Sequence, residues 1–255
     1  MADPNHVRDS APRLFVASDL RRGETVKLDE GQAHYLRNVM RLPQDAGLML
    51  FNGRDGEWRA TLNHSGKRAA EAVVTRQSRA QTAAPDIWLL FAPIKRTPGD
   101  YIAQKATELG VSALMPVITR RTIVTRVNDE RLRANAIEAA EQCERLDVPQ
   151  CFPARPLMDV LADWPQDRVL VFADEAGVDD GDAAPMALAL ATHRGAKKKF
   201  ALLIGPEGGF DPAERAAIRR LKQAIAVTLG PRILRADTAA LAGLALFQAN
   251  CGDWS

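Results

Sequence analysis

The stretch Lys198-Lys199-Phe200-Ala201-Leu202-Leu203-Ile204 runs directly into Gly205-Pro206-Glu207-Gly208-Gly209-Phe210. A second apolar run, Ala224–Leu229, continues in the same way into Gly230–Thr238. Each pattern is typical of a strand, a Gly-Pro loop and a following helix. Glycine allows a ligand to approach the backbone closely, and open α/β sheets bind ligands beyond the carboxyl ends of their strands. The two loops therefore predict a pocket in which main-chain atoms hold a small ligand.

The sequence before these loops predicts the rest of an α/β domain. Strand-length apolar runs alternate with helix-length patterns from residue 87 onward, which is typical of a parallel sheet. Asp211-Pro212-Ala213-Glu214 predicts a helix start, with Asp211 as N-cap, proline at the first position and glutamate at the third. The elements expected before the two loops are strands at 87–92, 113–117 and 169–173 and helices near 100–109, 130–145 and 185–192.

The N-terminal third has a different pattern. Short strand-like runs separated by turn signals such as Asn52-Gly53 and Asp55-Gly56 predict a small β-barrel, with one helix at Ala33–Met40. The expected domains are a loose leader over residues 1–11, the barrel over 12–78, a linker over 79–86 and the α/β domain over 87–255.

Composition excludes several classes of protein. The chain has 255 residues, 46% of them hydrophobic, and no apolar run near the roughly 20 residues that span a bilayer, so we expect no membrane association. Three cysteines without a CxxC pair and four scattered histidines predict no metal site and reduced thiols in a cytoplasmic protein. GxGxxG, GxxxxGK[ST] and GxSxG motifs are absent. A formal net charge of +2 is too small to indicate a nucleic-acid partner.

Charged side chains remain at the two loops as candidates for chemistry. Glu207 follows the first strand, and Arg235, Asp237 and Thr238 follow the second. A purely structural interpretation is also open, in which Glu207 faces the next helix N-terminus and Asp237 or Thr238 caps the last helix.

Several motifs together resemble one family. They are Leu203–Phe210, Leu229–Ala239, Gln104–Val111, Pro116-Val117 with Arg120-Arg121, Glu138–Cys143, His34–Leu42 and Phe51–Gly53. In this order they are similar to the trefoil-knotted SPOUT methyltransferases, and in particular to the branch that methylates N3 of a uridine in small-subunit (16S) ribosomal RNA. The resemblance covers nearly the whole chain after residue 12.

The resemblance implies a deeply knotted parallel-sheet domain, preceded by a PUA-like RNA-binding barrel, that forms a homodimer through the knotted domain. It implies that S-adenosylmethionine is the cofactor, with Arg235 stabilising a uracil anion and Glu207 or Asp237 taking the N3 proton. RNA contacts are expected at Arg37 and Arg41, which lie four residues apart on one helix face, and at Arg120 and Arg121, with Lys95 and Arg96 extending the track. The implied cofactor-binding residues are Leu203, Ile204, Gly205, Leu229, Gly230, Ile233, Leu234, Thr238 and Ala239.

Two positions depart from the family pattern. Glu144 stands where a glycine is usual, and Asp237 stands where glutamate is usual, which shortens a carboxylate by one methylene. Two alternative functions stay open: a knotted ribose 2′-O-methyltransferase, whose usual Asn-x-x-x-Arg pattern is absent between Lys95 and Glu108, and a non-catalytic RNA-binding or assembly protein of the same fold.

Overall fold

The computed structural model describes residues 11–66, 68–93, 99–124, 126–175, 183–195 and 198–254. The expected leader therefore lies outside the described residues except for Ala11, as do Lys95 and Arg96. The chain divides into two compact units. The first contains the described residues up to Ala83 together with Glu141–Asp147, and the second contains Ala84–Ala140 and the described residues from Val148 onward.

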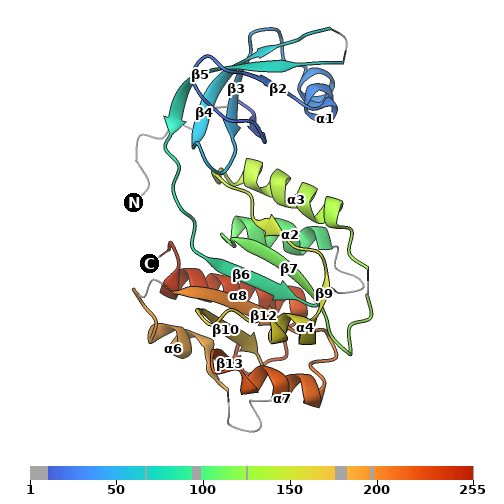
Figure 1. Ribbon diagram of the computed structural model, residues 1–255, viewed down its shortest axis with the longest axis vertical. Coiled ribbons are helices and arrows are strands. Elements are labelled where there is room, and N and C mark those ends of the chain that lie inside the picture. The colour runs from blue at the N-terminus through green and yellow to red at the C-terminus, as the bar shows by residue number, and fades with distance from the viewer. Residues whose placement is uncertain are drawn as a thin grey trace. The chain divides into compact units, whose positions relative to one another are not determined.

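The first unit is built on a five-stranded sheet with the order β1-β3-β4-β5-β2 (Figure 1). β1 pairs with β3 in parallel and the remaining pairs are antiparallel. Buried side chains such as Leu14, Leu36, Leu50 and Leu62 form its hydrophobic core. Its strands are β1 (Arg13–Phe15), β2 (Thr25–Lys27), β3 (Gly47–Phe51), β4 (Glu57–Asn63) and β5 (Glu71–Arg79).

A short helical segment follows β2. Helix α1 (Glu30–His34) begins with a capping box, in which the Asp29 carboxylate accepts a hydrogen bond from the Gln32 main-chain N–H at 2.8 Å and the Gln32 side-chain oxygen accepts one from the Asp29 main-chain N–H at 3.2 Å. It continues into the π-helical turn η1 (Tyr35–Val39). The predicted helix is confirmed, but it starts earlier and changes its winding halfway, which apolar spacing alone does not reveal.

A buried carboxylate organises the segment Glu141–Asp147 within the first unit. Glu57 is 2% exposed and bonds to Arg13 Nε at 2.8 Å and to Arg79 Nη2 at 2.7 Å. The same two arginines donate to the main-chain carbonyls of Glu141, Glu144 and Arg145. These hydrogen bonds link the segment to the N-terminal unit, in which Glu141–Asp147 is included although it lies within the range 87–255 expected for the α/β domain.

The second unit contains an eight-stranded sheet in which every pairing is parallel. Its order is β11-β13-β10-β12-β6-β7-β8, with β9 also pairing with β7. The predicted α/β domain with a parallel sheet is thus confirmed. The strands are β6 (Ile87–Phe91), β7 (Ala113–Ile118), β8 (Gln150–Cys151), β9 (Arg155–Pro156), β10 (Arg168–Ala173), β11 (Ala184–Pro185), β12 (Lys199–Ile204) and β13 (Ala224–Thr228).

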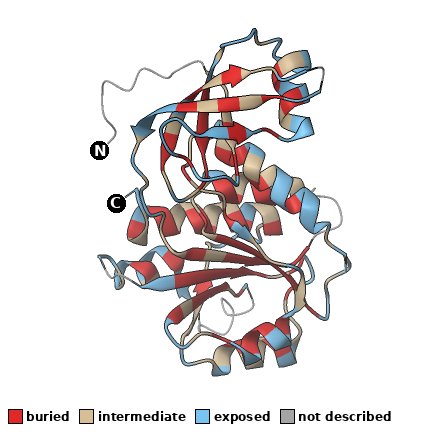
Figure 2. Cartoon of the chain, turned by 45° about the horizontal axis from the view of Figure 1, so that its top comes forward, coloured by how far each residue is buried: buried red, intermediate tan, exposed pale blue. Residues whose placement is uncertain are grey.

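Successive strand residues point to opposite sides of this sheet, so its apolar strands make both faces apolar, and helices cover both of them. In β12, Phe200, Leu202 and Ile204 join one core, and Ala201 and Leu203 join the other. The central strands β6, β7, β10 and β12 are accordingly buried along most of their length, while the helices alternate buried and exposed stripes (Figure 2). The first core includes residues of α2 (Gly99–Glu108), α3 (Asp129–Gln142), α6 (Met186–Ala191) and α8 (Ala236–Cys251), and the second includes residues of α4 (Leu157–Ala162) and α7 (Pro212–Arg220).

Candidate cofactor pocket and active site

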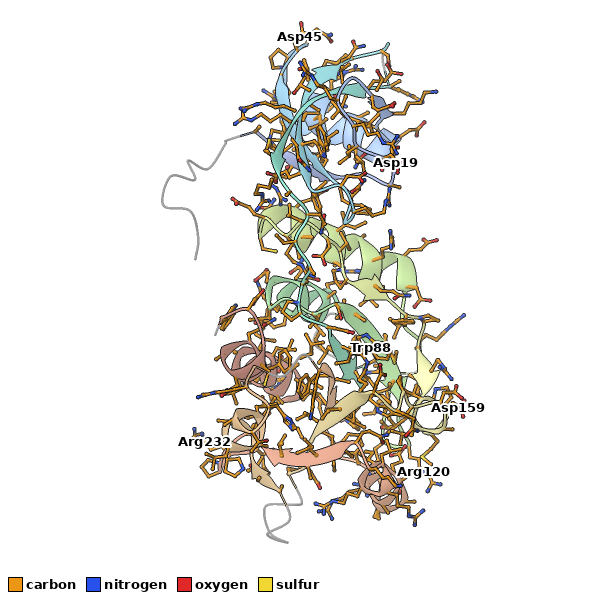
Figure 3. All side chains as sticks on the ribbon, turned by 60° about the vertical axis from the view of Figure 1, so that its left-hand side comes forward. Asp19, Asp45, Trp88, Arg120, Asp159 and Arg232 are labelled. Atoms are coloured by element: carbon orange, nitrogen blue, oxygen red, sulfur yellow. The ribbon has the colours of Figure 1, made fainter. Side chains whose placement is uncertain are left out.

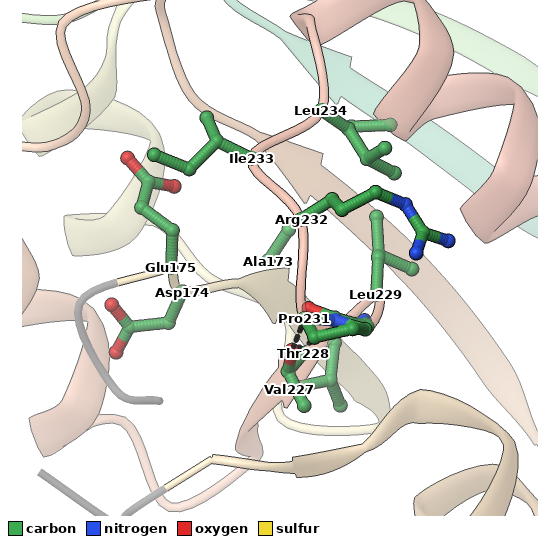
Figure 4. Close-up of a pocket in the computed structure, with 12 residues that line it drawn as sticks. Ala173, Asp174, Glu175, Val227, Thr228, Leu229, Pro231, Arg232, Ile233 and Leu234 are labelled. Atoms are coloured by element: carbon green, nitrogen blue, oxygen red, sulfur yellow. Dashed lines mark hydrogen bonds between the residues drawn. The ribbon is translucent and has the colours of Figure 1, made fainter. Parts of the chain in front are cut away.

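A pocket of about 310 Å³ lies at the carboxyl ends of β10 and β13 (Figure 4). This is where parallel sheets bind ligands, and the volume falls at the lower end of the range typical of small-molecule sites. One wall is the continuous stretch Val227–Leu234, and the others are Ala173, Asp174, Glu175 and Ala239. Five of the predicted cofactor-binding residues line it: Leu229, Gly230, Ile233, Leu234 and Ala239.

The second Gly-Pro loop has a backbone conformation that favours glycine. Gly230 has φ 113°, a region that L side chains rarely adopt. The Thr228 hydroxyl accepts from the Gly230 amide at 3.2 Å and donates to the Gly230 carbonyl at 3.1 Å, which holds the turn at the end of β13. The loop therefore exposes main chain at Gly230, which is part of the pocket lining.

The remaining predicted cofactor-binding residues lie outside the pocket lining. Leu203 and Ile204 are buried in the two cores of the sheet, so their side chains are used in packing. Gly205 begins the first loop, where an added Cβ would come within 3.0 Å of the Phe210 ring. Thr238 is exposed in the first turn of α8.

Asp174 fastens the end of β10 to helix α7. Its carboxylate is 3% exposed and accepts from Arg215 Nε at 2.9 Å and from Arg219 Nη2 at 2.7 Å. Removing one partner of such a buried ion pair costs about 3–5 kcal/mol, because an uncompensated charge stays behind. Neither Asp174 nor Glu175 was predicted as a site residue, although two acidic residues directly after the expected strand at 169–173 were a usable signal.

The three predicted catalytic residues lie on loops and a helix start rather than in the pocket lining. Glu207 is exposed on the first loop, and Arg235 is exposed as the N-cap of α8, with no hydrogen bond from its side chain to the helix. Asp237 accepts from the Thr238 amide at 2.7 Å. Asp237 is not the N-cap, which is Arg235, but an acidic side chain in the first turn is stabilised by the helix N-terminus.

Arg120 and Arg121, predicted to contact RNA, are both engaged with the first loop and its helix. Arg121 Nη1 donates to the Gly208 carbonyl at 2.8 Å. Arg120, labelled in Figure 3, pairs with Asp211 at 3.1 Å, and its amide donates to the buried Glu214 carboxylate at 2.9 Å. Glu214 also accepts from Asp211 N in the predicted capping box, so it joins the turn after β7 to the start of α7.

Arg37 belongs to a basic surface of the first unit, which also includes Arg68. A pocket of about 400 Å³ is lined by Glu30, Ala33, His34, Arg37, Asn38 and Arg68. Beside these residues, Tyr35, Val39 and Met40 are 40%, 62% and 37% exposed. Arg41 is exposed and lies beyond the end of η1 with φ 53°, a strained backbone for a residue with a side chain. The prediction that Arg37 and Arg41 share one helix face is therefore wrong, because the helical segment ends before Arg41.

Within the ranges that the structure describes, no group of three or more His, Cys, Asp or Glu side chains could hold a metal ion. No helix within those ranges is both long and apolar enough to cross a membrane.

Comparisons with known proteins agree with this architecture. The family model of an RNA methyltransferase domain matches residues 81–248, and that of an RNA methyltransferase PUA domain matches residues 28–75. A parallel sheet with a pocket at its strand ends, joined to a PUA-like unit, defines a two-domain RNA methyltransferase of the SPOUT class.

Named proteins that are similar to this chain show which family within this class it belongs to. Ribosomal RNA small subunit methyltransferase E of Rickettsia conorii is 31% identical, over 91% of this chain and 93% of the relative. The crystal structure of ribosomal RNA small subunit methyltransferase E from Neisseria gonorrhoeae bound to S-adenosyl methionine is 29% identical, with a TM-score of 0.84, and the match covers 96% of this chain and 100% of that one. A putative methyltransferase from Legionella pneumophila, in complex with SAM, is 26% identical with a TM-score of 0.79 over 95% and 99% of the two chains. The chain belongs to the ribosomal RNA small subunit methyltransferase E family.

Proposed function

We propose that this chain transfers a methyl group from S-adenosylmethionine to N3 of a uridine in small-subunit (16S) ribosomal RNA. The observation that supports this most is the pocket walled by Val227–Leu234, because it lies at the strand ends of a chain whose relatives are named for this RNA subunit. The pocket suits the cofactor: main chain is accessible at Gly230, and Leu229, Leu234 and Ala239 supply apolar contact for an adenine ring.

The residues around the pocket support methylation of a ring nitrogen. S-adenosylmethionine supplies an electrophilic methyl group on a sulfonium centre. The uracil N3 proton must leave before that nitrogen is a good nucleophile, so the site needs a proton acceptor and a cation for the developing anion. Arg235, exposed at the start of α8, provides the cation.

Of the two candidate proton acceptors, we assign the role to Glu207. The Asp237 carboxylate is bonded to its own helix at Thr238 N, whereas the Glu207 carboxylate is exposed and makes no hydrogen bond or ion pair with any described residue. Glu207→Gln should lower kcat by about 10²–10⁴-fold, the usual contribution of a general base, with cofactor affinity unchanged. A larger loss in Asp237→Asn than in Glu207→Gln would reverse the assignment.

The deciding experiment is transfer of a tritiated methyl group from S-adenosylmethionine to unmethylated small ribosomal subunits, followed by digestion to nucleosides. Label on N3 of uridine is expected. Label on a ribose hydroxyl would identify a 2′-O-methyltransferase instead, and binding of the subunit without transfer would identify a non-catalytic RNA-binding protein.

The surface around η1 is proposed to bind single-stranded RNA. Basic side chains beside exposed apolar and aromatic groups suit such RNA, because the cations attract phosphates and an aromatic ring stacks on a base. Tyr35→Ala should weaken binding of a single-stranded oligoribonucleotide by about 1–3 kcal/mol in fluorescence anisotropy, while Tyr35→Phe retains it. Arg68→Ala should reduce the slope of log K against log salt by about 0.7. Equal affinities for Tyr35→Ala and Tyr35→Phe would exclude stacking.

Two identical chains are proposed to associate through the C-terminal domain. The dimer is proposed to act in the cytoplasm. Ile233 supports the association, because its side chain is 90% exposed at the pocket rim, where a second chain would cover it. Light scattering after size exclusion should give twice the chain mass, and a single-chain mass would contradict the proposal.

A further inference from the structure

The two acidic residues that follow β10 have different environments. Asp174 is buried and neutralised by Arg215 and Arg219. Glu175 is exposed, lines the pocket, and its side chain diverges from that of Asp174 in Figure 4. Among the residues that the structure describes, none donates a hydrogen bond to the Glu175 carboxylate or forms an ion pair with it.

Glu175 also lies against the first Gly-Pro loop. Gly209 has φ 68°, and a Cβ added there would lie 2.7 Å from Glu175 Oε1. The backbone of the first loop therefore runs directly beside this carboxylate, while the second loop forms the pocket wall opposite. Glu175 is thus a negative charge placed between the two loops, and the glycine leaves room for it.

We propose that Glu175 binds the cofactor by accepting hydrogen bonds from S-adenosylmethionine. The inference rests on the proposed function. An ionised carboxylate is only an acceptor, so it needs a donor, and charge-assisted hydrogen bonds are the strong ones. The cofactor has two sources of such a donor, the ribose hydroxyls and the ammonium group of its methionine part, and both would pair with the same carboxylate.

The test is calorimetric titration of the full chain with S-adenosylmethionine and with 5′-methylthioadenosine, which retains the ribose but lacks the amino-acid part. Glu175→Gln removes the charge at nearly constant size and should raise the Kd for S-adenosylmethionine about tenfold. An equal rise for 5′-methylthioadenosine identifies the ribose hydroxyls as the donors. An unchanged value assigns the interaction to the part that 5′-methylthioadenosine lacks, which carries the ammonium group and the sulfonium charge. Glu175→Asp keeps the charge and should lose less than Glu175→Gln.

Asp159→Asn is the matched control, because it removes one exposed carboxylate from α4, away from the pocket lining, and should leave both Kd values within about twofold. Unchanged circular dichroism and melting temperature in Glu175→Gln establish that the fold is intact. A Kd within twofold of the parent for both ligands in Glu175→Gln would overturn the inference. Failure of the parent chain to bind S-adenosylmethionine would instead overturn the proposed cofactor.

Discussion

Replacing Glu144 by glycine should stabilise this protein. Helix α3 ends at Gln142, and Glu144, two residues later, has φ 62°, the left-handed conformation in which many helices end on glycine. The Glu144 carbonyl accepts from Arg79 Nη2 at 2.9 Å, so the strained residue is held in place by the hydrogen bonds of the first unit. The family resemblance places a glycine here, and the backbone angle gives the physical reason.

The magnitude follows from two opposing terms. A left-handed conformation costs a residue with a Cβ about 1–2 kcal/mol, and glycine loses this cost. Glycine also has more conformational freedom in the unfolded chain, which lowers the free energy of unfolding by about 0.5–1 kcal/mol. The midpoints of these two ranges leave a net gain of about 0.75 kcal/mol, which corresponds to a rise in melting temperature of about 1.5–3 °C for a chain of this size.

The assay is urea unfolding and thermal melting followed by circular dichroism. Glu144→Ala is the control, because it removes the same side-chain contacts but keeps the Cβ that strains the backbone. We expect Glu144→Gly to exceed Glu144→Ala by about 0.5–1 kcal/mol in the free energy of unfolding. If the alanine variant were as stable as the glycine variant, residue 144 would not be left-handed in solution and the reasoning would fail.

Three further outcomes follow from individual contacts. Burial acts to raise the pKa of Glu57, but hydrogen bonds and charges from Arg79 and Arg13 outweigh it, and the pKa lies below its usual value. The stability that this carboxylate contributes is complete above the ordinary carboxyl pKa of 4.5 and is lost as pH falls from there through the folded-state pKa. In urea titrations, Glu57→Gln should therefore weaken the decline of stability at acid pH, and it should lower the free energy of unfolding at pH 7 by about 3 kcal/mol. Arg121→Ala should lower kcat several-fold with little change in KM for RNA if Arg121 supports the loop through Gly208, whereas a phosphate contact would raise KM and weaken its salt dependence. Burial raises the pKa of Cys151 to about 11, so iodoacetamide at pH 8 should modify it far more slowly than an unhindered thiol, as peptide mass spectrometry can measure.

The sheet was predictable because its strands are buried on both faces. Continuous apolar runs at Ile87–Phe91 and Lys199–Ile204, separated by helix-length patterns, leave few arrangements other than a parallel sheet. The two-residue strands β8, β9 and β11 were not predicted, because two residues carry no periodicity.

Hydrogen bonds and ion pairs between residues that are distant in the sequence were harder to predict. The sequence places Arg120 and Arg121 after a strand as a basic pair, and an RNA contact is the natural expectation for exposed arginines. Their bonds to Asp211 and Gly208 depend on β7 and β12 ending at the same edge of the sheet, which requires the strand order. The inclusion of Glu141–Asp147 in the first unit could not be predicted for the same reason, because it depends on contacts between residues distant in the sequence.

Exposure divides the carboxylates of this chain into two groups that sequence cannot separate. Glu57, Asp174 and Glu214 are each about 2–3% exposed and fully engaged, so they fix strand ends and helix starts. Glu175 and Glu207 are exposed, and neither has a hydrogen bond or ion pair to any described residue. A carboxylate already neutralised by arginines gains little from a ligand, whereas an unpaired one can form a strong charge-assisted bond when a donor arrives. Because Glu175 and Glu207 follow the carboxyl ends of neighbouring strands, β10 and β12, cofactor binding and proton removal can be divided between them at one edge of the sheet.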